Sequence, residues 1–233
     1  MRRPARTVGV LGGMGPIATH DFFGKVLAAS NARTDDDHIR LIIDNNPFVP
    51  DRNAAANGGP SPGPALAAMA RGLEAAGAEL LAMPCNAAHA WADEIRAAVR
   101  IPFVHMIEET VASVRAATPD ARRVGVLAAD GCLRAELYQD ALFRAGSFPL
   151  RLAVGEQAAF MDLIYRVKGG KVDVAMRAEM RGYAERLLAA GAEAIVAGCT
   201  EIPLALAPGD ITAPLIESTT VLAQRVVVLA RAD

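Results

Sequence analysis

Residues 75–85 read AAGAELLAMPC, and residues 189–199 read AAGAEAIVAGC. Both stretches open with the same five residues and reach a cysteine after five further, mostly apolar residues. In each, a glycine is placed to end a helix, and the apolar residues that follow are typical of a buried strand. Residues 8–11 and 124–127 also match, because both read VGVL. The chain therefore contains an internal repeat of roughly 115 residues.

Short apolar runs alternate with longer helical patterns along the chain, and Gly77 and Gly191 fit the ends of two helices. This order predicts an α/β fold in which parallel sheets are flanked by helices. The expected strands cover residues 8–11, 39–43, 80–83, 124–127, 150–154 and 194–197. The expected helices cover residues 17–30, 64–76, 87–99, 133–145, 172–190 and 219–230.

The repeat predicts two pseudo-symmetric α/β domains with an active site in the cleft between them. We expect residues 1–113 to form the first domain and residues 114–207 the second, because residues 118–120 (Thr-Pro-Asp) interrupt the pattern. The C-terminal helix, within residues 208–233, is expected to pack back on the first domain. Residues 57–64 are rich in glycine and proline and indicate a surface loop, with a lid over a site as the alternative.

Composition excludes several classes of protein. The 233 residues are 52% hydrophobic and 21% charged, which is typical of a chain with a packed core. A net charge of −2 gives no bulk attraction to nucleic acid or an anionic membrane. No apolar run approaches the ~20 residues that span a bilayer, and residues 1–7 resemble no signal peptide, so we expect a cytoplasmic protein. Three cysteines do not suit a disulfide scaffold.

Cys85 and Cys199 each follow a predicted strand and precede a predicted helix. Ligands of parallel α/β sheets bind beyond the carboxyl ends of strands, where the N–H groups of a helix start favour anions. We expect a lowered thiol pKa at such a position. Asn86 and Thr200 follow the two cysteines and can add an amide and a hydroxyl to the same place.

Pseudo-twofold symmetry would put the two thiols on opposite sides of one cleft. That arrangement suits inversion at a carbon atom, because one thiolate can remove a proton while the other thiol delivers one to the opposite face. A single cysteine is more often a small buried residue. Two cysteines at equivalent positions of a repeat favour catalysis instead.

The chain resembles the cofactor-independent aspartate/glutamate racemase superfamily over nearly its whole length. Glu201 favours the aspartate racemase branch, since typical glutamate racemases have histidine after the corresponding Cys-Thr. The segments that carry the resemblance are GGMGP (12–16), DNNP (44–47), PDR (50–52), PCN (84–86) with His89, MIEET (106–110), IY (164–165) with Lys168 and Gly170, and GCTEIP (198–203).

The resemblance implies a racemase of an acidic amino acid, with no pyridoxal phosphate, no other cofactor and no metal. It implies that Cys85 and Cys199 act as the acid/base pair on opposite faces of the α-carbon. Members of the superfamily are usually homodimers, so a second copy of the chain is the expected protein partner. No nucleic-acid or membrane partner is expected.

The remaining site residues are also assigned by resemblance. Arg52 and Lys168 match residues that hold the distal carboxylate of the substrate. Asn86 and Thr200 match the cradle of the α-carboxylate. Met14 and Glu201 are expected to contact the substrate as well.

Ala87 and Cys132 depart from the family pattern, in which both positions commonly hold threonine. We still expect both to lie at the substrate site. A lost hydrogen bond to a charged ligand group costs about 1.5–3 kcal/mol, which is enough to change specificity. The substrate could therefore be aspartate, glutamate or a related carboxylic acid.

Other interpretations remain open at this point. Residues 13–18 fit G-x-G-x-x-A after a strand, and with Asp44 they weakly suggest a dinucleotide site. Cys85 and His89 could pair on a metal, although we favour a structural role for His89. A binding protein without catalysis is another alternative. A related decarboxylase is disfavoured because both paired cysteines are present.

Overall fold

The computed structural model describes residues 5–232. The expectation of a cytoplasmic protein was drawn from residues 1–7, and most of these lie outside the described residues. The strands of the described chain are β1 (Val8–Gly12), β2 (Leu41–Asn45), β3 (Leu80–Ala82), β4 (Phe103–Val104), β5 (Arg123–Ala128), β6 (Phe148–Leu150), β7 (Ala194–Gly198) and β8 (Leu215–Glu217).

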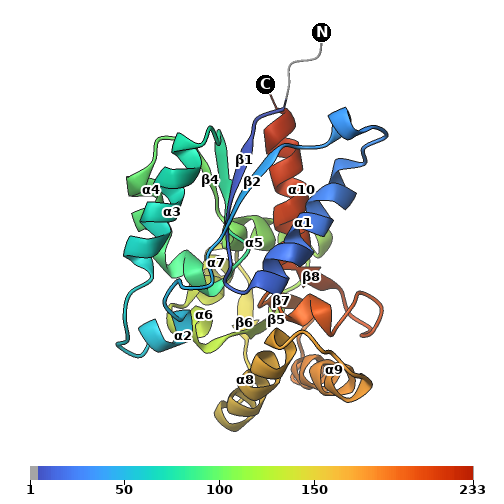
Figure 1. Ribbon diagram of the computed structural model, residues 1–233. Helices are drawn as coiled ribbons and strands as arrows, with labels where there is room; N and C mark the ends of the chain where they lie inside the picture. The colour runs from blue at the N-terminus through green and yellow to red at the C-terminus, as the bar shows by residue number, and fades with distance from the viewer. Residues whose placement is uncertain (1–4, 233) are drawn as a thin grey trace.

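These strands form two four-stranded sheets in residues 5–232, and every paired strand is parallel (Figure 1). The first sheet has the order β2-β1-β3-β4 and the second the order β6-β5-β7-β8. If the strands of each sheet are numbered separately in chain order, the two sheets have the same strand order. The predicted α/β fold with two similar halves is therefore confirmed.

Helices cover the sheets and connect their parallel strands, as parallel pairing requires. The α-helices are α1 (Pro16–Ser30), α2 (Arg52–Ala55), α3 (Gly63–Ala75), α4 (Ala92–Ala98), α5 (Met106–Ala117), α6 (Asp130–Arg134), α7 (Leu137–Arg144), α8 (Val154–Lys168), α9 (Val174–Ala189) and α10 (Ser218–Arg231). The short 3₁₀ helices are η1 (Asp35–Asp37), η2 (Ala87–Trp91) and η3 (Ile202–Leu204).

The central strands are apolar because both of their faces are covered. All residues of β1 and β7 are buried, as expected for strands inside a parallel sheet. Gly77 and Gly191 follow α3 and α9 with φ of +95° and +93°, which glycine adopts without steric cost. The two predicted helix ends are therefore confirmed, at equivalent places in the repeat.

One predicted strand, residues 150–154, is wrong. The strand β6 lies earlier, at Phe148–Leu150, and the N–H of Phe148 donates to the carbonyl of Arg122. It contains Pro149, which an edge strand tolerates because one side of its backbone has no neighbour. The chain then enters α8 at Val154, where the carboxylate of Glu156 accepts the N–H of Ala153.

Two predicted helices are interrupted. Residues 87–99 form η2 and then α4, so the turns nearest Cys85 are 3₁₀ turns. Residues 133–145 are divided between α6 and α7 because Glu136 takes a left-handed conformation, with φ of +53°. The helices α2, α5 and α8 and the edge strands β4 and β8 were not predicted from the sequence.

The last helix, α10, lies beside α1 of the first half (Figure 1). Its residues Leu222 and Val226 pack in one buried cluster with Val8 and Phe22. The strand just before it, β8, pairs with β7 of the second sheet. Residues 208–232, the described part of this C-terminal segment, therefore contact both halves. No helix within residues 5–232 has the length and apolar character needed to cross a bilayer.

Candidate active site

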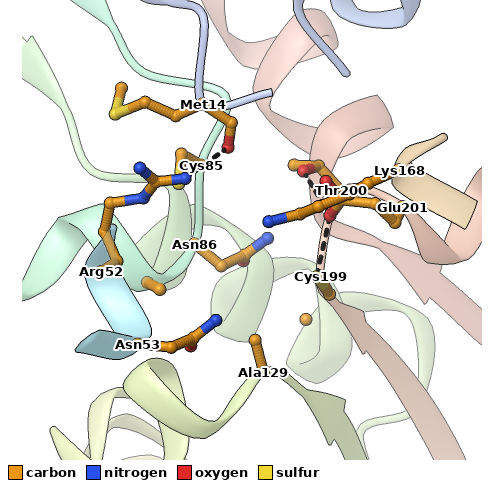
Figure 2. Close-up of a pocket in the computed structure, with 12 residues that line it drawn as sticks. Met14, Arg52, Asn53, Cys85, Asn86, Ala129, Lys168, Cys199, Thr200 and Glu201 are labelled. Carbon is orange, nitrogen blue, oxygen red and sulfur yellow. Dashed lines mark hydrogen bonds between the residues drawn. The ribbon is translucent and has the colours of Figure 1, made fainter. Parts of the chain in front are cut away.

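One cavity lies where the carboxyl ends of central strands from both sheets face each other (Figure 2). Met14 follows β1 and Cys85 follows β3, whereas Ala129 follows β5 and Cys199 follows β7. The cavity is small, and it has about 320 Å³ of empty space when its open mouth is included. It is lined by Met14, Arg52, Asn53, Cys85, Asn86, Ala87, Ala129, Lys168, Gly198, Cys199, Thr200 and Glu201.

Nine of the ten residues singled out from the sequence lie around this cavity. Cys132 does not, because α6 turns its side chain into the core, where it is 0% exposed. It lies behind the cavity wall, in one cluster with Ala87, and burial together with the nearby Cys85 raises the pKa of its thiol. Cys132 was expected at the substrate site, but its side chain does not line the cavity. The segment 57–64 does not line the cavity either, which favours its interpretation as a surface loop.

The two thiols face the cavity from opposite sides (Figure 2). Cys85 belongs to the loop after β3, and Cys199 belongs to the equivalent loop after β7. Both side chains are buried, with exposed fractions of 6% and 7%. The repeat in the sequence therefore becomes a pair of thiols across one small space.

Cys199 donates its Sγ–H to Oε2 of Glu201, with 2.9 Å between the two atoms. The hydroxyl of Thr200 donates to the same oxygen at 3.1 Å. Burial and the negative charge of Glu201 raise the pKa of Cys199 well above its usual range. The expectation of a lowered pKa is therefore wrong for Cys199, since η3 is short and the carboxylate outweighs its N–H groups.

Arg52 begins α2 and is buried, at 8% exposure. Its guanidinium donates to the carbonyls of Val49 and Pro50 at 3.3 and 3.1 Å. A further N–H donates to the carbonyl of Met14 at 3.3 Å. These bonds hold the cation at the edge of the cavity beside Cys85 (Figure 2).

Lys168 is the last residue of α8 and reaches into the cavity from the second half (Figure 2). Burial acts to lower the pKa of its amine, but interactions with Glu201 first, and with Cys199 and Cys85 after it, outweigh burial and raise the pKa. Lys168 is therefore a cation at neutral pH. The two halves thus each supply one positive charge to the cavity.

Asn86 is buried and takes part in hydrogen bonds on both ends of its amide. The hydroxyl of Tyr138 donates to Oδ1 at 2.6 Å, and Nδ2 donates to Oγ of Ser218 at 3.0 Å. Asn86 therefore connects the first half, the second half and the start of α10.

His89 has a structural place below Cys85 rather than a place in the cavity. Its Nδ1 lies 2.9 Å from the carbonyl of Cys85, and its Nε2 accepts the N–H of Met106 at 3.0 Å. Burial, followed by the nearby His105, lowers the pKa of His89 to about 3, so the ring is neutral. Among residues 5–232, no three His, Cys, Asp or Glu side chains are grouped to hold a metal ion.

A comparison with known sequences identifies the family. A sequence model described as Asp/Glu/Hydantoin racemase matches residues 11–226. The chain belongs to the Asp/Glu/hydantoin racemase family. The match to the family model covers both halves of the chain and every residue that lines the cavity.

Several proteins with similar sequences or structures are named as racemases. The broad specificity amino-acid racemase RacX of Bacillus subtilis (strain 168) is 28% identical over 227 residues, 94% of this chain and 96% of that one. A glutamate racemase of Roseiflexus sp. (strain RS-1) is 37% identical over 171 residues, 69% of this chain and 59% of that one. Picrophilus torridus aspartate racemase has a similar structure, with a TM-score of 0.83 and 27% identity over 97% of this chain and 94% of that one.

The high pKa of Cys199 in this racemase-family chain predicts a specific pH dependence of alkylation. We expect iodoacetamide to modify Cys199 slowly at pH 7–8, with a rate that still rises about tenfold per pH unit there, since only the thiolate reacts. Glu201→Gln removes the neighbouring negative charge and should shift this rise to lower pH. Mass spectrometry of the Cys199 peptide measures the rate, and a wild-type plateau below pH 8 would contradict the assignment.

The low pKa of His89 predicts a stability effect. In the unfolded chain, His89 should bind a proton below its ordinary pKa of ~6.5. In the folded protein, its ring stays neutral until the pH falls to about 3. Stability should therefore fall with decreasing pH through this window, by up to ~1.4 kcal/mol per pH unit from this residue. Urea unfolding should show a shallower pH dependence for His89→Gln, whereas His38→Gln, at an exposed position, should keep the wild-type slope. Equal slopes in all three proteins would refute the role of His89.

Three lining residues were not predicted: Asn53, Ala129 and Gly198. Oδ1 of Asn53 accepts the N–H of Gly131 at 2.9 Å, and its Nδ2 donates to the hydroxyl of Tyr165 at 3.1 Å. Asn53 thus joins α2 of the first half to the second half beside the cavity. Its position directly after Arg52 in the sequence was a signal that could have found it.

Proposed function

We propose that this protein racemises an acidic amino acid, aspartate or glutamate, by moving the α-proton between Cys85 and Cys199. The observation that supports this most is the placement of two thiols, from equivalent loops of a repeat, on opposite sides of one cavity. A proton can be removed from one face of a carbon and replaced on the other only if a group stands on each side.

In the proposed step, one cysteine removes the α-proton and the other supplies a new proton. The thiolate of one cysteine takes the α-proton, so an S–H bond forms as the Cα–H bond breaks and its electron pair moves toward the α-carboxylate. The opposite cysteine gives its proton to the α-carbon from the other face and becomes the thiolate. Because Cys199 has a raised pKa, we assign it as the acid for one direction of the reaction. The roles reverse for the other enantiomer.

Charges in the cavity support an acidic substrate. Apart from the two cysteines, the charged lining residues are Arg52, Lys168 and Glu201, which together leave one net positive charge. A dicarboxylic amino acid with a protonated amine carries one net negative charge. We assign the distal carboxylate to Arg52 and Lys168, and the α-carboxylate to Asn86 and Thr200. These donors also stabilise the negative charge that grows on the α-carboxylate as the proton leaves.

A wider substrate range is a second candidate. Ala87 lines the cavity and supplies no hydroxyl for a substrate group, and the RacX relative is named as a broad specificity amino-acid racemase. Neutral amino acids therefore belong in the assay panel. Racemisation of a neutral amino acid at rates near those for aspartate would favour this candidate over the acidic one.

Incubation in D₂O tests the proposal. Both enantiomers of aspartate and of glutamate are followed for chirality and for deuterium at the α-carbon. We expect each active substrate to approach the racemate with one deuterium gained per inversion. No α-exchange with any amino acid of the panel would overturn the proposal.

Further parts of the proposal rest on the family resemblance. We include catalysis without pyridoxal phosphate or a metal, a homodimer and a cytoplasmic location. Activity of the purified protein after dialysis against a chelator, and its mass by sedimentation, address the first two.

A further inference from the structure

The side chain of Asn86 lines the cavity but is held from behind by two hydroxyl groups. Tyr138, in α7 of the second half, donates its O–H to Oδ1 at 2.6 Å. Ser218, the first residue of α10, receives a hydrogen bond from Nδ2 at 3.0 Å. Both hydroxyl residues are 0% exposed, and neither lines the cavity.

The directions of these hydrogen bonds leave one orientation for the amide. Ser218 has a single hydroxyl proton, which it donates to the carbonyl of Ala197 at 2.8 Å, so toward Asn86 it can only accept. Tyr138 is fully buried, which raises its pKa and keeps its hydroxyl protonated, so it donates to Asn86. The amide oxygen must then face Tyr138 and the amide nitrogen must face Ser218.

The same tyrosine also lies against the loop of the second thiol. A Cβ atom on Gly198 would be 2.7 Å from Cε2 of Tyr138, so the ring packs directly on the residue before Cys199. The carbonyl of Ala197, which accepts the hydrogen bond from Ser218, lies near the end of β7, just before Gly198. The network therefore joins the loop of Cys85 to the loop of Cys199 at the back of the cavity.

We propose that Tyr138 and Ser218 are positioning residues that hold the Asn86 amide with its second N–H directed at the α-carboxylate of the substrate. This inference rests on the proposed racemase function. Nδ2 has two protons, and Ser218 engages one of them, so the other is free for a ligand. A donor fixed in advance stabilises the charge that develops on the carboxylate without the cost of turning during the reaction.

Tyr138→Phe tests the first contact, because it removes one oxygen atom and keeps the ring. We expect kcat to fall roughly tenfold, with KM changed by no more than about threefold, as for one lost hydrogen bond that acts mainly in the transition state. Tyr183→Phe is the matched control, since Tyr183 is a buried tyrosine in α9 that does not line the cavity. It should keep kcat within about twofold of wild type.

Ser218→Ala tests the second contact in the same way, with Ser147→Ala as control. Ser147 is also buried and also donates to a backbone carbonyl, that of Ala121, but lies outside the cavity. If both hydroxyls act through one amide, the double variant Tyr138→Phe/Ser218→Ala should lose less than the product of the single losses.

The outcomes separate this inference from the proposed function. Circular dichroism and thermal unfolding measure the folded fraction, and kcat is expressed per folded protein. The positioning role would be overturned if the wild type is active and Tyr138→Phe keeps the same kcat. It would also be overturned if the variants lose no more kcat than their control variants. Losses that multiply fully in the double variant would also overturn it. Wild-type protein without α-proton exchange would instead overturn the proposed function.

Discussion

Cys85→Ser and Cys199→Ser should each lower kcat for racemisation by roughly 10³-fold or more. General acid–base catalysis contributes 10²- to 10⁴-fold per group, and a serine hydroxyl is far too weak an acid to replace a thiol at neutral pH. Both enantiomers of aspartate and glutamate are assayed by chiral chromatography. Cys132→Ala is the control, because this third cysteine is buried behind the cavity wall and should leave kcat near that of wild type.

The two thiol variants should also differ from each other. Each keeps one thiol on one face, so any residual exchange of the α-proton with D₂O should be confined to one enantiomer. The enantiomer that exchanges should be opposite in the two variants. Retention of more than a tenth of wild-type racemisation by either variant would refute the two-thiol assignment.

Arg52→Ala should lower kcat/KM for dicarboxylic amino acids by roughly 10- to 150-fold, which corresponds to the loss of a hydrogen bond to a charged group. The effect should lie mainly in KM, because the distal carboxylate changes little during the reaction. Neutral amino acids that the enzyme accepts should lose much less. The measurement is a comparison of steady-state rates across acidic and neutral substrates.

The control for Arg52 must account for its bonds to backbone carbonyls. Arg231→Ala removes a guanidinium that likewise donates to backbone carbonyls, those of Ser30 and Asp37, at 2.7 and 2.9 Å. It should lower stability without changing the selectivity for dicarboxylates. An equal loss with acidic and neutral substrates in Arg52→Ala would argue against its role at the distal carboxylate.

The repeat made much of the fold predictable. The paired cysteines, the glycines after α3 and α9 and the matched strands β1 and β5 are local patterns, and each appears twice. The strand β6 was misplaced because it contains Pro149, and proline is unusual in strands other than edge strands. The edge strands β4 and β8 were missed because they are only two and three residues long.

The chemistry of the site depends on contacts that local sequence does not specify. Glu201 follows Cys199 by two residues, but only the η3 turn shows that its carboxylate meets the thiol and raises its pKa. The partners of Asn86 lie 52 and 132 residues away along the chain. Cys132 was placed at the cavity by the family resemblance, whereas α6 directs its side chain into the core.

Incubation of the wild-type protein with single enantiomers of aspartate and glutamate in D₂O tests racemisation by the two thiols. We expect conversion to the racemate with α-deuterium in the newly formed enantiomer, since the incoming proton comes from a thiol that exchanges with solvent. Inversion without deuterium in the product would contradict a two-thiol mechanism. Failure of every amino acid tested, neutral ones included, to lose its α-proton would contradict the proposed racemase activity itself.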